Sequence, residues 1–175
     1  MQSLPLEAKV RMTEARIKAW HEHWGGDVYI SFSGGKDSTV LKHIADSLYP
    51  SIPSVFVNTG LEYPEVRSFA LRQKNVIRLD PAMRFYDVIE KYGYPVVSKE
   101  QSQFLYEART TKSEKLLGIR LNGNRWGKGK ISEKWKFLID APFKISNKCC
   151  DVMKKAPVKK YERETGNKAI VGTMA

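Results

Sequence analysis

The stretch Tyr29-Ile30-Ser31-Phe32-Ser33-Gly34-Gly35-Lys36-Asp37-Ser38-Thr39-Val40-Leu41 decides the fold of this chain. It is typical of a buried strand, a glycine turn and the first turns of a helix. The first N–H groups of a helix lack backbone partners and carry roughly half a positive charge. Gly34 and Gly35 allow the backbone to close around phosphate oxygens, and Lys36 adds a full charge. The sequence therefore predicts a site for a phosphate chain.

The motif at 33–38 differs from two common phosphate-binding motifs. It is not a Walker A loop, because no glycine stands at the required spacing before Gly35-Lys36 and Asp37 takes the place of the hydroxyl residue. It is not the GxGxxG fingerprint of dinucleotide-binding folds either. A plain strand-to-helix turn is the structural alternative, but such a turn needs neither two glycines between serines nor a lysine at a helix start.

The composition fits a globular protein that binds anions. The chain has 175 residues, 42% of them hydrophobic, and a formal net charge of +11. This charge favours nucleotides, polyphosphates or nucleic acid without choosing among them. The sequence contains neither an apolar run long enough for a membrane span nor the features of a secretory signal, and its two cysteines are adjacent. We therefore expect a cytoplasmic protein without membrane contact. The sequence does not decide whether it forms a homo-oligomer.

Hydrophobic periodicity predicts alternating strands and helices along the chain. An amphipathic helix at 4–24 lies in an N-terminal segment, 1–27, and a nucleotide-binding domain spans 28–175. Strands are expected at 28–32, 55–57, 76–79 and 169–173, with helices between them. This order predicts an α/β fold, a doubly wound parallel sheet with helices on both faces. Ligands of such sheets bind beyond the carboxyl ends of strands, here at 33–35 and 58–60.

Residues 112–136 differ from the rest in composition. They contain six lysines, two arginines, four glycines and two acidic residues, which gives a net charge of +6 by subtraction (8 − 2). We expect a flexible basic insertion here, for which there are two alternative roles. It is either a flap over the active site or, through Trp126 and Trp135, a surface on which nucleic-acid bases stack. The chain also ends just after its last expected strand, which suggests a C-terminally truncated form.

Three motifs in the order found here resemble the phosphoadenosine phosphosulfate (PAPS) reductase family of the PP-loop, adenine-nucleotide alpha-hydrolase-like superfamily. They are Ser33–Ser38, Phe56–Glu65 and Lys148–Pro157. The likeness is greatest to small stand-alone proteins of phages and gut bacteria. The resemblance implies the strand order 3-2-1-4-5 and an adenosine held between the first two strand ends.

Two features depart from the reductases of this family. Their PP-loop is usually eroded, whereas the loop here is intact, as in the relatives that use ATP. They also place a catalytic cysteine near the C-terminus, and no cysteine follows Cys150. A thiosulfonate intermediate requires a thiolate nucleophile, which lysine cannot replace.

These features lead to three hypotheses. In the first, ATP is cleaved at the α–β bond and its adenylyl group passes to an oxyanion, the anionic second substrate. In the second, the protein is a PAPS or adenylyl-sulfate reductase of sulfur assimilation that lacks the usual C-terminal cysteine. In the third, it is a nucleotide-dependent module that binds or modifies nucleic acid, as in DNA phosphorothioation.

The resemblance also suggests residue roles. The expected nucleotide-binding residues are Phe32, Ser33, Gly34, Gly35, Lys36, Asp37, Ser38, Val57, Asn58, Thr59, Gly60 and Glu62. The expected catalytic residues are Lys36, Asp37, Lys99, Arg109 and Lys148. The last three are candidates to face the negative charge of the second substrate, and the alternative is that they are ordinary surface cations.

The expected cofactors are ATP or a PAPS-like adenine nucleotide together with Mg²⁺, which Asp37 could hold through water. Helix capping is the alternative role for Asp37. Cys149 and Cys150 are candidate ligands of an iron–sulfur cluster, but a cubane cluster normally takes four thiolates, so packed thiols are the expected state.

Overall fold

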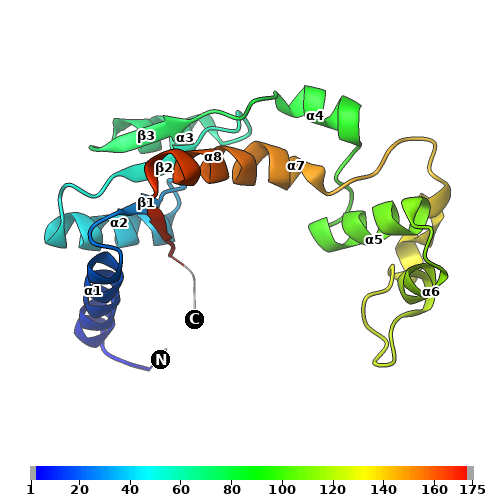
Figure 1. Cartoon of the computed structure of the whole chain (residues 1–175), viewed down its shortest axis with the longest axis horizontal. Coiled ribbons are helices and arrows are strands. Elements are labelled where there is room, and N and C mark those ends of the chain that lie inside the picture. Colours follow the sequence, from blue (N-terminus) through cyan, green and yellow to red (C-terminus); the bar gives the residue numbers. More distant parts are fainter. Residues whose placement is uncertain (1–2, 173–175) are drawn as a thin grey trace. The chain divides into compact units, whose positions relative to one another are not determined.

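The computed structural model describes residues Ser3–Gly172. The chain divides into two compact units (Figure 1). The first consists of the chain up to Pro81 and from Ala156 onward, and the second is Ala82–Lys155. These bounds differ from the division at residue 27 that the sequence suggested. None of the helices at 3–172 is long and apolar enough to cross a bilayer.

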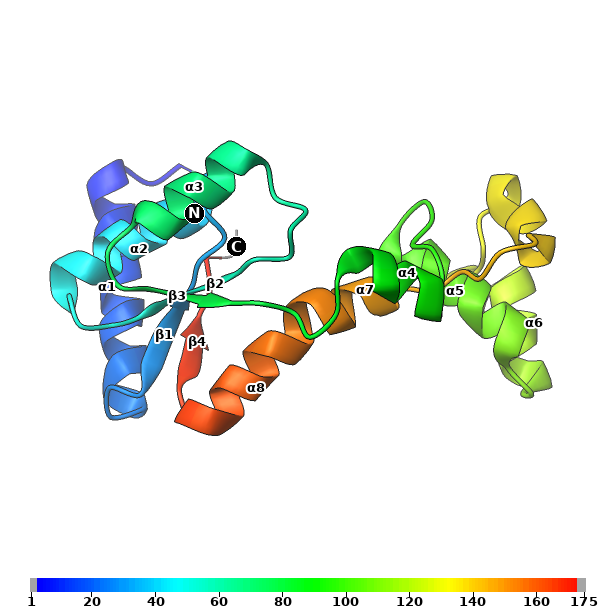
Figure 2. The same cartoon turned by 90° about the horizontal axis from the view of Figure 1, so that it is seen from above.

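The first unit is built on a parallel sheet of four strands (Figure 2). The strands are β1 (Val28–Ser31), β2 (Ser54–Val57), β3 (Val76–Leu79) and β4 (Lys168–Ile170). Their order is β3-β2-β1-β4. In the register, Ile30 lies opposite Ser54 and Ile170, and Val55 lies opposite Ile77. The order agrees with the first four strands of the expected sheet; the described residues contain no fifth strand, and Thr173 lies outside them.

Helices cover both faces of this sheet, which confirms the doubly wound α/β fold. They are α1 (Leu6–His23), α2 (Lys36–Leu48), α3 (Pro64–Arg72) and α8 (Ala156–Thr165). Ile30 of β1 packs in a cluster with Ile17 of α1 and Leu41 of α2. Its neighbour Tyr29 packs with Tyr161 of α8. Successive strand residues point to opposite faces, so α1 and α2 cover one face and α8 the other (Figure 2).

The N-terminal helix is thus part of the core of the first unit. Ile17 is only 2% exposed and belongs to the same cluster as Val28 and Ala45. At the other end of the unit, α8 begins at Ala156, directly after the π-helical turn Asp151–Lys155, and includes Pro157 and Tyr161. Proline is tolerated in a first helical turn, where its missing N–H would have no intrahelical partner.

The second unit is mostly helical. It contains α4 (Phe85–Tyr92), α5 (Lys99–Thr110), α6 (Glu114–Asn122), the 3-10 helix η1 (Glu133–Asp140), α7 (Lys148–Cys150) and the π-helical turn η2 (Asp151–Lys155). Its core is a cluster of four buried side chains: Phe104, Leu105, Ile131 and Ile145.

The basic segment 112–136 has more structure than its composition suggested. It contains α6 and the start of η1, and Ile131 is completely buried in the core of the second unit. Arg120 forms an ion pair with Glu107 of α5, donates to the carbonyl of Gly129 at 2.7 Å and lies over the Phe104 ring. The segment is therefore attached to α5 by apolar and charged contacts, whereas its composition led us to expect a flexible insertion.

Candidate functional site

The glycine turn after β1 is packed closely against α3. The N–H of Phe32 continues the sheet by donating to the carbonyl of Val55 at 2.9 Å, and α2 begins four residues later at Lys36. Gly34 between them has φ +74°. A Cβ atom there would lie 3.0 Å from Cγ1 and 3.2 Å from the carbonyl oxygen of Val66. Glycine at position 34 is thus required by both conformation and space.

Two serine hydroxyls hold the shape of the loop. Ser38 Oγ accepts from the N–H of Ser33 at 3.2 Å and donates to the carbonyl of Gly35 at 2.9 Å. The hydroxyls of Ser33 and Ser38 are 3.0 Å apart. Ser38 is buried, whereas Ser33 is exposed. The sequence placed both serines among the expected nucleotide-binding residues, and in the structure the hydroxyl of Ser38 also orders the loop.

The N-terminus of α2 presents uncapped donors. Its N-cap residue is Gly35, and no side chain caps the first turn. Lys36 and Asp37 are both exposed, and neither forms an ion pair within Ser3–Gly172. A helix start with open N–H groups and an adjacent lysine favours an anion.

At the end of β2, Glu62 organises the turn. Its carboxylate accepts from the N–H of Thr59 at 3.0 Å and from the hydroxyl of Thr59 at 2.6 Å. The sequence placed Glu62 among the expected nucleotide-binding residues, and these two bonds to Thr59 give it a task in the turn. Gly60 has φ +78° and no atom within 4 Å of its hypothetical Cβ, so the space beside it is open.

Asn58 contributes a buried polar group with unused capacity. It is 8% exposed, and its amide N–H₂ donates to Asp80 at 2.7 Å. Its Oδ1 is buried without a hydrogen-bond partner in the described chain. Arg78 also donates to Asp80. The hydrogen bonding from Arg78, and to a smaller extent that from Asn58, holds the pKa of the Asp80 carboxyl below its usual value.

Sequence reasoning did not select Asp80 as a site residue. The available signal was its position directly after β3, at the same edge of the sheet as Phe32 and Asn58. The pairing of Asn58 with Asp80 joins the carboxyl ends of β2 and β3.

The loop and this strand edge lie within a recognised domain. A sequence model described as "Phosphoadenosine phosphosulfate reductase domain" matches residues 27–121, which is more than half of the chain. The chain belongs to the phosphoadenosine phosphosulfate reductase domain family.

A curated relative of this PAPS reductase domain is an uncharacterized protein of Methanocaldococcus jannaschii. It is 33% identical over 69 residues, which cover 37% of this chain and 17% of the relative. The chain thus spans about a sixth of the length of that relative. The match supports a domain shared with that relative, but it does not indicate an activity, because the relative is uncharacterized.

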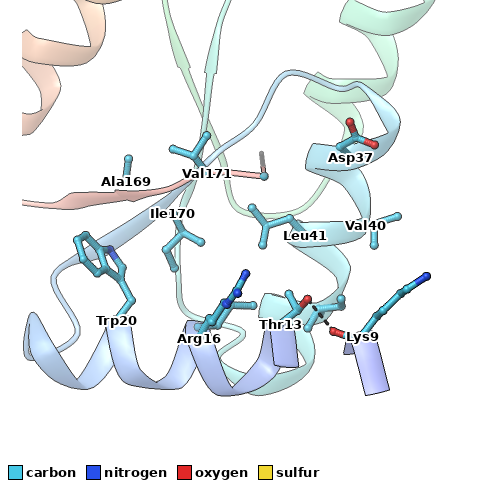
Figure 3. Close-up of a pocket in the computed structure, with 13 residues that line it drawn as sticks. Lys9, Thr13, Arg16, Trp20, Asp37, Val40, Leu41, Ala169, Ile170 and Val171 are labelled. Atoms are coloured by element: carbon cyan, nitrogen blue, oxygen red, sulfur yellow. Dashed lines mark hydrogen bonds between the residues drawn. The ribbon is translucent and has the colours of Figure 1, made fainter. Parts of the chain in front are cut away.

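A pocket lies beside the loop in the first unit of the chain (Figure 3). Its volume is about 740 Å³. Its walls come from α1, α2 and the end of β4, and they include Trp20, Leu41 and Ile170, with Arg16 and Asp37 among the charged lining residues. The local sequence pattern does not indicate this pocket, because β4 is far along the chain from α1 and α2.

The remaining predicted catalytic residues lie in the second unit. Lys99 is the first residue of α5 and Lys148 the first of α7, and both are exposed. Arg109 donates to the carbonyl of Phe143 at 2.8 Å and to that of Ala141 at 3.0 Å. Its guanidinium therefore joins α5 to the segment after η1, which gives Arg109 a structural task.

The cysteine pair does not form a complete metal site in the described residues. Cys149 and Cys150 are free thiols in α7, and residues 3–172 contain no group of three or more His, Cys, Asp or Glu side chains that could hold a metal ion. A cubane cluster normally requires four thiolates. Burial, and then the neighbouring Cys150, raises the pKa of Cys149. A raised pKa favours the protonated thiol, which is the poorer ligand and nucleophile.

Proposed function

We propose that this PAPS reductase domain binds ATP with its phosphates on the loop 33–38 and cleaves the α–β bond, transferring the adenylyl group to an oxyanion. The observation that carries the proposal is the loop geometry. Gly34 is pressed against α3, Gly35 leaves the start of α2 uncapped, and Lys36 is exposed next to it. This arrangement offers N–H groups and a cation to one anion.

The proposed reaction needs alignment and positive charge more than covalent help. The oxyanion attacks the α-phosphorus, the bond to the bridging oxygen breaks, and pyrophosphate leaves with the electron pair. Loop N–H groups and Lys36 stabilise the charge that develops on the leaving oxygens. Mg²⁺ bound to ATP needs only one or two protein carboxylates, so Asp37 alone suffices as a partner.

The adenosine would lie over the ends of β1 and β2. The unpaired Oδ1 of Asn58 supports this placement, because a buried acceptor without a partner is unusual and a ribose hydroxyl would satisfy it. The N–H of Phe32 is bonded to Val55, so its carbonyl would be the group that meets the adenine amine, with the backbone of Val57 beside it. The expected contacts of Lys99 and Lys148 with the second substrate stay predictions.

Calorimetry and an assay of pyrophosphate release test the proposal. ATP with Mg²⁺ should bind, and pyrophosphate should form once an acceptor is present. The Lys36→Ala variant should bind ATP at least about tenfold more weakly, since it loses a charge-assisted contact with phosphate. Lys74→Ala, an exposed lysine of the same unit with no hydrogen bond or ion pair in the described chain, is the matched control and should behave as the parent. Equal ATP affinity in Lys36→Ala and the parent would disprove the loop assignment.

The family match favours one second candidate, a reductase-type reaction on PAPS. The same titrations discriminate between the two. Tighter binding of a 3′-phosphorylated adenosine without metal would support reduction, and tighter binding of ATP with Mg²⁺ supports adenylyl transfer.

A further inference from the structure

The connection between α6 and η1 contains a loop with a defined shape, residues 123–130, which we call the tryptophan loop (Figure 1). The N–H of Asn124 donates to the carbonyl of Lys128 at 2.8 Å, and the N–H of Gly127 donates to that of Asn124 at 2.8 Å. The side-chain oxygen of Asn124 accepts from the N–H groups of Trp126 and Lys128, each at 3.0 Å. The loop therefore closes on itself.

The C-terminal base of the tryptophan loop is attached to the second unit. Arg120 of α6 holds the carbonyl of Gly129 and pairs with Glu107. Ile131, directly after the loop, is fully buried, and its N–H donates to the carbonyl of Arg120 at 2.8 Å. The loop is thus a preformed projection, and preformed shape lowers the entropic cost of binding.

Trp126 is the prominent residue of this projection. Its side chain is 65% exposed, and the guanidinium of Arg125 lies 3.8 Å from its ring centroid. Arg125 lies over one face of the indole, and the exposed fraction of 65% leaves indole surface open for stacking. An arginine in this position can stack with its plane while its N–H groups donate to an acceptor such as a phosphate.

The charges around Trp126 have one sign. Arg125, Lys128 and Lys130 form no ion pair within the part of the chain that the structure describes. The loop 123–130 contains no acidic residue. Three cations without ion pairs lie within six residues of the loop, next to an exposed aromatic ring. The cations are suited to the phosphates of a nucleic acid, and the ring is suited to its bases.

We propose that the tryptophan loop binds single-stranded nucleic acid. One base stacks on the open face of Trp126, and Arg125, Lys128 and Lys130 contact the phosphates on either side. Single strands fit better than duplexes, because only an unpaired base exposes its face to an indole. The proposal concerns a surface of the second unit and does not depend on the loop 33–38.

The test is fluorescence anisotropy with labelled oligothymidine and oligouridine about 12 nucleotides long, and with a duplex of the same length. Both single strands should bind more tightly than the duplex. Three phosphate contacts predict that the logarithm of the binding constant falls with that of the salt concentration with a slope of about −2. The Trp126→Ala variant should bind about tenfold more weakly, and Trp126→Phe should retain most of the affinity.

Tyr86→Ala is the matched control, since Tyr86 is an equally exposed aromatic residue in α4 of the same unit, at 72%. It should bind as the parent does, and so should Lys36→Ala, which separates this proposal from the nucleotide site. Melting temperatures of the variants should match that of the parent, because Trp126 and Tyr86 are both exposed. The proposal is overturned if neither single strand binds, if the duplex binds as tightly, or if Trp126→Ala leaves the affinity unchanged.

Discussion

At the scale of single residues, two glycines show how conformation and contacts limit a position. Gly34 lies in the loop 33–38, and Gly166 lies between α8 and β4. Both have left-handed φ values, +74° and +80°. Only Gly34 is also confined by neighbouring atoms, those of Val66 and Ala70. Substitutions at these two glycines therefore distinguish the cost of the left-handed backbone, which both share, from the cost of close packing, which applies to Gly34.

Gly34→Ala should lower the free energy of unfolding by about 2–5 kcal/mol, of which about 1–2 kcal/mol is the left-handed conformation and the rest the clash with α3. The same change should weaken ATP binding, since the loop must move. Gly166→Ala, with open space around it, should cost about 1–2 kcal/mol and leave ATP affinity unchanged. Urea titration and calorimetry measure both quantities. Equal costs for the two variants would show that packing against α3 does not matter.

The residue types of the loop 33–38 could be predicted from the sequence because their constraints are local. The roles of Ser38 and Glu62 could not, since each depends on which of several partners a hydroxyl or carboxylate meets after folding. Asp80 was missed for the same reason: its partner Asn58 is 22 residues away.

At the scale of elements, the basic segment 112–136 is the clearest difference between expectation and structure. Its glycines and lysines are typical of a flexible insertion, and local composition is what a sequence reading weighs. Yet Ile131 packs with Phe104, Leu105 and Ile145. Ile131, the ion pair of Arg120 with Glu107 and the hydrogen bond from the N–H of Ser132 to Gln101 attach the segment to α5.

Ile131→Ala should lower the free energy of unfolding by about 2–5 kcal/mol, because it removes a fully buried side chain and leaves a cavity. Ile131→Val should cost only about 0.5–1.5 kcal/mol. Lys130→Ala, at the exposed neighbouring position, is the control and should be close to neutral. Urea unfolding of the three variants checks this order. An Ile131→Ala variant as stable as the parent would indicate that the segment is not packed on α5.

At the scale of the whole molecule, the net charge of +11 acts on every anionic ligand. Charges within about one Debye length of the loop raise the local concentration of a polyphosphate, and salt screens this effect.

The affinity for ATP should therefore fall by more than about threefold between about 0.05 and 0.5 M salt, where the Debye length shrinks severalfold. Adenosine, which has no phosphate, should bind with an affinity that salt hardly changes. Calorimetry of both ligands at two salt concentrations measures the difference. An ATP affinity that does not respond to salt would contradict an exposed, charge-driven phosphate site.

The amino-acid sequence by itself determined the parallel α/β fold and the position of the glycine loop at 33–38. These follow from short-range properties: alternating apolar runs, glycines at a strand end and a lysine at a helix start. The order of the first four strands came from the resemblance to a known family and not from local pattern. Only the tertiary structure decided that the chain forms two compact units, that Ser38 and Glu62 order their own turns, that Asn58 keeps an unpaired oxygen, and that Trp126 projects from an anchored loop. Those features arise from contacts between residues distant in the chain or from a choice among competing partners, which packing settles and local pattern does not.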